Sequence, residues 1–508
     1  MYDEYDSESP PHVSVAPPAP EPPSADDSRG GGAAQGALWT TLGHGGAQAI
    51  RLANNLIMTR LLAPEDFGVM LIVTTIYIGL HLFSDVGLGA SLIHNDREDE
   101  RFQNTAWTIE AIRGLVVAAG LLIAAPFVAS VYHTPLLAKI LPVTAAVAII
   151  ESLSSTRYAT HQRHLHLKPL VALSIGSQLF AVVVMIAWAV VSPTIWALVA
   201  GQVAKEVVFV IGTHTLLPGL RNRFTFDKTA AREFLHFGRW IVLSTMLGYL
   251  ASTTDRFVFG KLIGVGALLG VYSIAAVLAG PVSDLFASLA YQVLFPYYAR
   301  MRREGQALGE AFREARWPLL VIGGWISAGI VAGGPTIVRM LYSPEYYAAG
   351  WMLQILATGV WFGIACEQTN MAGILALGES RWTAVSAASK LIGLVVFIPV
   401  GWHLAGFPGA VAGFAVGDLV RYGVSAYAAS RLGLRGYVQD AKIALRGAVS
   451  IVLCELALRM LTMWVDFVVL DAVVIFVVTT IVWLDWLWPI AQRVRGGASP
   501  FRPKEEAA

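Results

Sequence analysis

Residues 194–217 read TIWALVAGQVAKEVVFVIGTHTLL, a long apolar run with few polar interruptions. An α-helix of about 20 residues crosses the roughly 30 Å of hydrocarbon in a bilayer. A second run, DFVVLDAVVIFVVTTIVWLDWLWPI at 466–490, has a similar length and character. Such runs predict membrane-spanning helices.

The composition of the whole chain supports the same conclusion. Its 508 residues are 56% hydrophobic and only 14% charged, and the mean hydropathy is +0.59. Soluble domains are about 45–50% apolar and about 25% charged. A β-barrel would show short alternating segments instead of long apolar runs. We therefore expect an all-α polytopic membrane protein. The formal net charge of +1 indicates no nucleic-acid partner.

Hydropathy predicts about fourteen spans along the chain. The last two follow a basic loop and form an appendage to a core of twelve. The predicted ranges are 38–62, 67–92, 105–131, 136–158, 169–192, 194–216, 234–259, 265–296, 317–341, 350–377, 381–402, 405–430, 442–463 and 466–490.

The two ends of the chain are predicted to be tails. Residues 1–36 are rich in Pro, Ser, Ala and acids, a composition that buries too little apolar surface to fold. They read as a disordered cytoplasmic tail, either a passive extension or a docking segment. The start MYDEYDSESPP lacks the apolar region of a signal peptide. Residues 491–508 form a second cytoplasmic tail.

Loop charge predicts the orientation. Basic residues concentrate in every second loop and in the last tail, including segments 94–103, 157–168, 218–232 and 299–316. The opposite loops contain few, mainly Arg60, Arg256 and Lys261. Cytoplasmic loops carry the excess of Lys and Arg. Both termini are therefore expected in the cytoplasm, with the protein in the bacterial inner membrane.

An internal repeat divides the predicted spans. Residues 54–76 read NNLIMTRLLAPEDFGVMLIVTTI, and residues 255–277 read DRFVFGKLIGVGALLGVYSIAAV. Each copy begins a group of six spans on the same side, so the duplication is parallel, as in transporters with two facing bundles. The expected units are an N-lobe (37–216), a cytoplasmic linker (217–231), a C-lobe (232–435) and the two added helices (436–490).

The repeat blocks also carry a family resemblance. The segments are TRLLAPEDFGVM (59–70), SDVGLGASLI (84–93), STTDRFVFGKLIGVGALLGVYSIA (252–275) and LAGPVSDLFASLAYQVLFPYYARM (278–301). Over about residues 38–435 the chain resembles the Wzx-type oligosaccharide flippases, the polysaccharide transporter branch of the multidrug/oligosaccharidyl-lipid/polysaccharide exporter superfamily. The resemblance implies two six-helix lobes and export of an undecaprenyl-diphosphate-linked sugar unit. The long N-terminal tail differs from the short N-terminal segment that is usual in this family.

Charged residues inside predicted spans require an explanation, because inserting each charge into hydrocarbon costs a few kcal/mol. Arg51, Arg239 and Lys390 have no acid nearby on their own spans. They predict a cationic cavity that binds a diphosphate, since Arg contacts phosphate in bidentate fashion. Pairing with an acid on another helix is the alternative. Arg113 and Arg421 are assigned to the same cavity, although Glu110 and Asp418, three residues before each, predict local ion pairs.

Three acids and one dipeptide complete the candidate site. Asp85, Asp284 and Glu367 are expected either to pair with those cations or to bind a coupling ion. Gly280 and Pro281 predict a hinge within a span, with simple helix packing as the alternative.

The predicted function is therefore transport of a lipid-linked oligosaccharide. No P-loop and no catalytic constellation are present, and no cofactor or metal is expected; the histidines near 161–166 read as loop residues. The expected partners are the lipid-linked oligosaccharide, membrane lipids, and the polysaccharide polymerase and export machinery. Rival predictions are a lipid II flippase, a multidrug cation antiporter, whose cavity should be acidic, and a membrane glycosyltransferase, which should carry a large soluble loop.

Overall fold

The computed structural model describes residues 27–85, 92, 99–306, 308–462 and 467–495. Side chains are described over these ranges apart from 27–38, 40–42, 44, 229–244, 366 and 462. In this part of the chain all regular structure is helical. The elements are α1 (Asp27–Leu61), α2 (Pro64–Ser84), α4 (Glu100–Val131), α5 (Pro135–Ser152), α6 (Arg157–Arg163), α7 (Leu167–Val191), α8 (Trp196–Thr215), α9 (Lys228–Ile263), α10 (Ala267–Leu289), η1 (Ala290–Leu294), α11 (Phe295–Arg303), α12 (Leu308–Leu341), η2 (Pro344–Tyr346), α13 (Ala349–Gly363), η3 (Ile364–Asn370), α14 (Met371–Ala376), α15 (Arg381–Arg431), α16 (Tyr437–Thr462) and α17 (Val468–Arg495).

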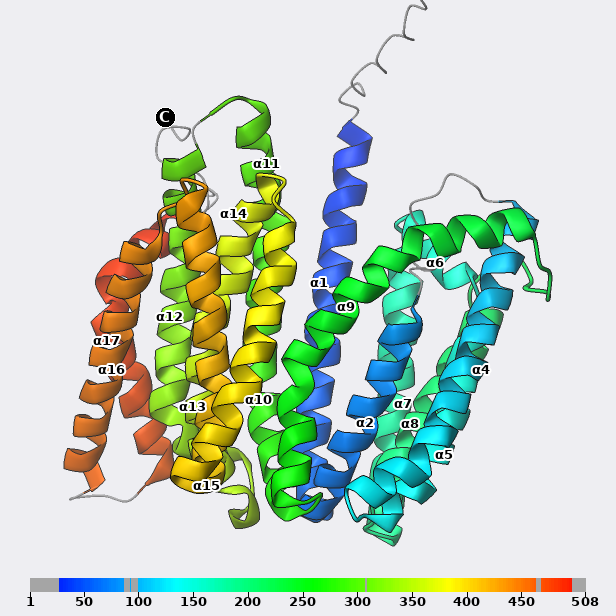
Figure 1. The fold of residues 1–508 in the computed structure, drawn as a ribbon, viewed down its shortest axis with the longest axis horizontal. Coiled ribbons are helices and arrows are strands. Elements are labelled where there is room, and N and C mark those ends of the chain that lie inside the picture. Colours follow the sequence, from blue (N-terminus) through cyan, green and yellow to red (C-terminus); the bar gives the residue numbers. More distant parts are fainter. Residues whose placement is uncertain (1–26, 86–91, 93–98, 307, 463–466, 496–508) are drawn as a thin grey trace, which may run out of the picture.

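The helices form two bundles that lie side by side (Figure 1). The N-lobe contains α1, α2 and α4–α8, and the C-lobe contains α10–α15. Helix α9 begins over the N-lobe and runs diagonally to the C-lobe, where it packs against α15. Helices α16 and α17 pack on α12 at the outer edge of the C-lobe. This is the predicted order of two lobes and an appendage.

Ten of the described helices are long and apolar enough to cross a membrane. Helix α15 bends back on itself, because Ala405 and Gly406 have non-helical backbone angles. Its two halves pack closely, and a Cβ on Gly413 would contact the Phe397 carbonyl. With α15 counted as two and with the long helices α1, α9 and α16, the described chain has the fourteen helices that hydropathy predicts.

The outer surface of the bundle is apolar, as a lipid-facing surface must be. Ile123, Phe127 and Val191 are 76%, 69% and 86% exposed. Exposed apolar patches of this extent are rare on soluble proteins. The protein is therefore a multi-pass membrane protein.

Two element boundaries differ from the sequence ranges. Helix α1 begins at Asp27 and so extends into the segment read as a tail. Helix α9 begins at Lys228, within the segment read as the linker. Gly264 directly follows α9 and has φ +79, a conformation that L side chains rarely adopt.

Candidate functional site

The two lobes meet through the repeated motif itself. Gly68 on α2 and Gly270 on α10 are equivalent positions in the two copies, and a Cβ on either lies 3.1 Å from the backbone nitrogen of the other. A Cβ on Gly68 would also overlap the Gly266 carbonyl, and one on Gly270 would overlap the Pro64 carbonyl. The contact is therefore nearly symmetric, and only glycine permits helices to approach so closely.

Hydrogen bonds hold the same end together. The Tyr342 hydroxyl donates to Asn55 Oδ1 at 2.8 Å, and Lys261 Nζ donates to the Val131 carbonyl at 2.9 Å. Each pair joins the two lobes near the C-terminal ends of α1, α4, α9 and α12, which lie at the end of the bundle opposite the start of α1 (Figure 1). The space between the lobes is therefore closed at this end.

Arg51 lies where the lobes face each other. It is exposed on α1 and donates a hydrogen bond to Gln48, its neighbour on the same helix. Asp284 on α10 is also exposed, and the charges of Arg51 and Asp284 interact. This places one predicted cation and one predicted acid on opposite lobes within electrostatic reach.

Lys390 has a partner that the sequence reading did not assign to it. Its Nζ lies 2.6 Å from Asp418 Oδ1, and the two side chains are 7% and 10% exposed. The ammonium also lies 4.6 Å from the centre of the Phe414 ring. Of the two alternatives predicted for Lys390, the structure shows pairing with an acid on another predicted span, because α15 bends back at Gly406 and brings Asp418 alongside it.

Arg421 pairs differently from the local prediction as well. Its guanidinium contacts the Glu367 carboxylate, so the expected Asp418–Arg421 pair is wrong. Glu367 lies in η3, a π-helical turn that interrupts the helix begun by α13. Such turns occur often at functional sites. Glu367 thus forms an ion pair with a cation of the predicted cavity.

A second buried acid of the C-lobe was not among the sequence candidates. Asp255 on α9 is 3% exposed and accepts a hydrogen bond from the Tyr272 hydroxyl on α10. It lies within electrostatic reach of Lys390. The repeat could have indicated this acid, because Asp255 occupies the position that Asn54 has in the first copy.

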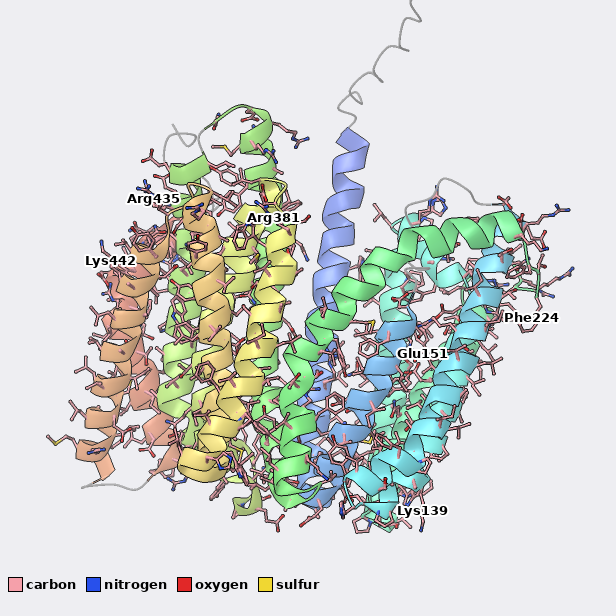
Figure 2. All side chains as sticks on the ribbon, viewed as in Figure 1. Lys139, Glu151, Phe224, Arg381, Arg435 and Lys442 are labelled. Carbon is pink, nitrogen blue, oxygen red and sulfur yellow. The ribbon has the colours of Figure 1, made fainter. Side chains whose placement is uncertain are left out.

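The N-lobe carries a larger polar network. Arg113 Nε donates to Glu110 at 3.0 Å, so this local pair is confirmed. Arg113 also donates to the His81 carbonyl at 3.1 Å, and its Nη2 lies 3.2 Å from His81 Nε2. Glu151 accepts from the Tyr77 hydroxyl and lies 3.9 Å from His81 Nδ1. Figure 2 labels Glu151 within this bundle.

The remaining candidates are less informative. The side chain of Arg239 lies outside the described residues. Asp85 follows the last turn of α2, and its charge interacts with that of Arg113. Helix α10 continues through Gly280 and Pro281, and the first irregular turn in its path is η1. The hinge and the substrate-binding roles therefore stay predictions.

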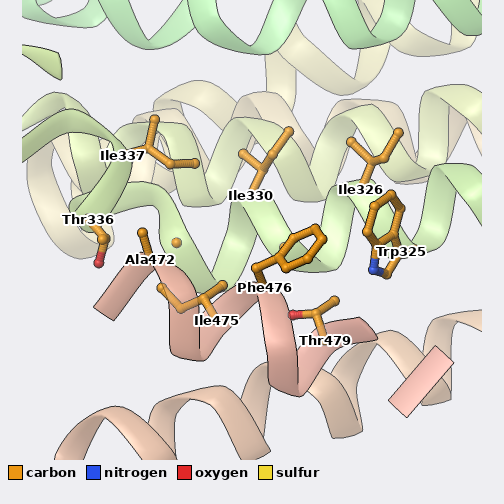
Figure 3. Close-up of a pocket in the computed structure, with 11 residues that line it drawn as sticks. Trp325, Ile326, Ile330, Thr336, Ile337, Ala472, Ile475, Phe476 and Thr479 are labelled. Carbon is orange, nitrogen blue, oxygen red and sulfur yellow. The ribbon is translucent and has the colours of Figure 1, made fainter. Parts of the chain in front are cut away.

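An apolar groove runs between α12 and α17, on the appendage side of the C-lobe (Figure 3). Its volume is about 270 Å³, and apart from two threonines its lining has no polar side chain except the indole of Trp325. Gly329 and Gly333 open its floor. The groove suits a hydrocarbon chain and not a charged group. The lining is Trp325, Ile326, Gly329, Ile330, Gly333, Thr336, Ile337, Ala472, Ile475, Phe476 and Thr479.

Curated proteins with similar sequences are named for biosynthesis or for biosynthesis transport. The chain is 23% identical over 352 residues to the teichuronic acid biosynthesis protein TuaB of Bacillus subtilis, covering 68% of this chain and 71% of that protein. It is 21% identical to the succinoglycan biosynthesis transport protein ExoT of Rhizobium meliloti, covering 71% and 73%. It is 20% identical to the lipopolysaccharide biosynthesis protein WzxC of Escherichia coli, covering 76% and 78%.

Solved structures share the fold. The lipid II flippase MurJ in an inward closed conformation superposes with a TM-score of 0.72 at 12% identity, covering 90% of this chain and 99% of that one. An inward-facing multidrug resistance MATE family transporter of the MOP superfamily gives 0.55 at 13% identity, covering 78% and 95%. The model of the polysaccharide biosynthesis protein family matches residues 57–428. With that match over most of its length, the chain belongs to the polysaccharide biosynthesis protein family.

Proposed function

We propose that the protein moves undecaprenyl-diphosphate-linked oligosaccharide repeat units from the cytoplasmic to the periplasmic leaflet for surface polysaccharide synthesis. The family match over residues 57–428 carries this proposal. The names of the similar proteins refer to teichuronic acid, succinoglycan and lipopolysaccharide, which are all surface polysaccharides. Two lobes that are joined at one end suit alternating access to a site between them.

The charged headgroup would bind between the lobes. Arg51 is exposed there, and Arg113 and Arg421 are arginines whose present partners are carboxylates. A diphosphate competes well for such arginines, because charge-assisted bidentate contacts to phosphate and to carboxylate have the same geometry. The polyprenyl chain would stay in the bilayer, and the groove between α12 and α17 has the apolar lining to hold part of it.

Charge at the two ends supports a cytoplasmic opening. Arg381, Arg435 and Lys442 lie toward the end of the molecule at which α1 begins, and Lys139 lies at the other end (Figure 2). The short helix α11 adds Arg300, Arg302 and Arg303 to the first group. By the positive-inside rule this end faces the cytoplasm of the inner membrane. The closed Gly68–Gly270 end then faces the periplasm.

The proposal is tested by Arg51→Ala in proteoliposomes that contain a fluorescent undecaprenyl-diphosphate oligosaccharide. We expect translocation to fall by about tenfold or more, since a lost charged hydrogen bond is worth about 1.5–3 kcal/mol. The matched control is Arg459→Ala, which removes an exposed arginine on α16 that pairs with Glu455 at 3.4 Å.

The outcomes separate the rival functions. Translocation of lipid II with none of the oligosaccharide would support the lipid II flippase. Exchange of organic cations for protons, without lipid movement, would support the multidrug antiporter. Equal rates for Arg51→Ala and the wild type would remove Arg51 from the site.

A further inference from the structure

One face of α2 carries a histidine that bridges three helices of the N-lobe. Tyr77 and His81 are one turn apart on α2, so they share a face. That face meets Arg113 of α4 and Glu151 of α5. His81 thus stands between a permanent cation on one side and a carboxylate on the other.

The contacts indicate which ring nitrogen of His81 accepts a hydrogen bond. Arg113 Nη2, 3.2 Å from His81 Nε2, can only donate. Nε2 must therefore carry the lone pair, and the ring proton lies on Nδ1, which faces Glu151 Oε2 at 3.9 Å. In this arrangement the acceptor nitrogen of His81 holds Arg113.

Several carboxylates lie around His81. The carboxylates that face this region are Glu110, Glu151, Glu206 and Asp85, whereas the permanent cations among the described side chains are Arg113 and Lys205. Lys205 is already 2.6 Å from Glu206, and the other neighbouring titratable group is Tyr77, a donor to Glu151. Among the described side chains around His81, carboxylates therefore outnumber permanent cations.

The opposite face of α2 contacts the C-lobe side of the molecule. Tyr249 of α9 donates its hydroxyl to the Thr75 carbonyl, lies 6.0 Å from the Phe83 ring centre, and would be 3.1 Å from a Cβ on Gly79. Residues 75, 79 and 83 are spaced by four and form one stripe. His81 and the contact between α2 and α9 therefore lie on opposite faces of the same helix, so a shift of α2 caused at His81 would also move that contact.

We propose that His81, held between Arg113 and Glu151, is the proton-binding site through which the transporter senses or uses a proton gradient. This rests on the proposed flippase function and names its coupling ion. Imidazole is the side chain that ordinarily changes charge between about pH 5 and 8.

The chemical step is a simple protonation. A proton from water adds to the Nε2 lone pair and forms the imidazolium, and no other bond is made or broken. The new N–H then faces the N–H groups of Arg113, so the contact between α2 and α4 becomes repulsive. The charged ring is attracted to Glu151 instead, and Arg113 keeps Glu110. Protonation thus changes the contacts between α2 and its neighbours. It also releases Nη2 of Arg113, an arginine that we propose binds the diphosphate.

The test measures lobe movement directly, without any lipid substrate. Spin labels are placed at Arg221→Cys and Arg381→Cys, exposed positions on the two lobes, after Cys366 and Cys454 are replaced by Ala. In the full-length protein in nanodiscs, we expect the distribution of distances between the labels to change between about pH 5.5 and about pH 8. His81→Gln keeps an acceptor and a donor but cannot gain a proton, so the change should disappear.

The control is His214→Gln. His214 lies in the same lobe, where Nε2 contacts the Leu153 carbonyl at 2.8 Å, and the pH-dependent change should survive its loss. Glu151→Gln is the second variant, and it should move the transition to lower pH because the imidazolium loses its carboxylate. A full pH response in His81→Gln overturns the proposal. A response that depends on His81, without oligosaccharide translocation, would sustain the proton site and reject the proposed function.

Discussion

The two lobes share a motif at their junction but differ in how they treat buried charge. In the C-lobe, the Lys390 ammonium and the Asp418 carboxylate, which are 7% and 10% exposed, form a direct ion pair at 2.6 Å. In the N-lobe, Arg113 is shared between Glu110 and His81. A one-to-one buried pair resists change, because removal of either partner leaves an uncompensated charge. A shared arginine can change partner at lower cost. The duplicated backbone therefore supports a fixed interior in one lobe and an adjustable one in the other.

The largest effect should come from breaking what the lobes share. Gly270→Leu would place a side chain against the Pro64 carbonyl at the junction. Overpacking of this kind costs about 1–3 kcal/mol or more, so the closed arrangement should lose its preference and translocation should fall at least about tenfold. Vesicle translocation assays measure the rate, and labels across the junction measure its opening.

Gly266→Ala is the control at the same turn, because a Cβ there meets nothing within 4 Å. It should leave both the rate and the junction unchanged. If Gly270→Leu transported normally, the symmetric glycine contact would not form part of the transport cycle.

The next test addresses the fixed pair of the C-lobe. Lys390→Met leaves Asp418 buried and unpaired, which should lower the free energy of unfolding by about 3–5 kcal/mol. Adding Asp418→Leu should recover most of that loss. Thermal unfolding in detergent measures both variants.

The N-lobe should respond less to the corresponding change. His81→Gln should alter the free energy of unfolding by only about 1 kcal/mol, because the side chain of His81 is partly exposed and glutamine still offers an acceptor. Equal destabilisation by Lys390→Met and His81→Gln would contradict the distinction between a fixed and an adjustable lobe.

A smaller effect is expected at the appendage, which packs on the C-lobe alone. Gly329→Leu would fill the groove between α12 and α17, where a Cβ meets nothing within 4 Å. We expect the KM for a polyprenyl-linked substrate to rise a few-fold, since a lost methylene contact is worth about 0.8 kcal/mol, while kcat stays the same. Gly447→Leu, at another open glycine on α16, should leave KM unchanged.

Several features of the site were accessible from sequence because they are local. The pair Glu110–Arg113 follows from a spacing of three residues on one helix. The Glu455–Arg459 pair, at 3.4 Å, follows from a spacing of four. The spacing of Asp418 and Arg421 gave the same kind of prediction and was wrong, because each residue has a better partner on another segment. Helical spacing shows which pairs can form, and tertiary packing selects among them.

Sequence by itself determined that this is a helical membrane protein with two repeated lobes, because hydropathy and repetition are properties of consecutive residues. It also marked the glycines of the repeat, although not what they touch. Only the tertiary structure decided that Gly68 and Gly270 meet, that Lys390 has a partner in Asp418, and that His81 lies between Arg113 and Glu151. The physical reason is that these contacts join residues far apart in the chain, whose proximity depends on how whole helices pack.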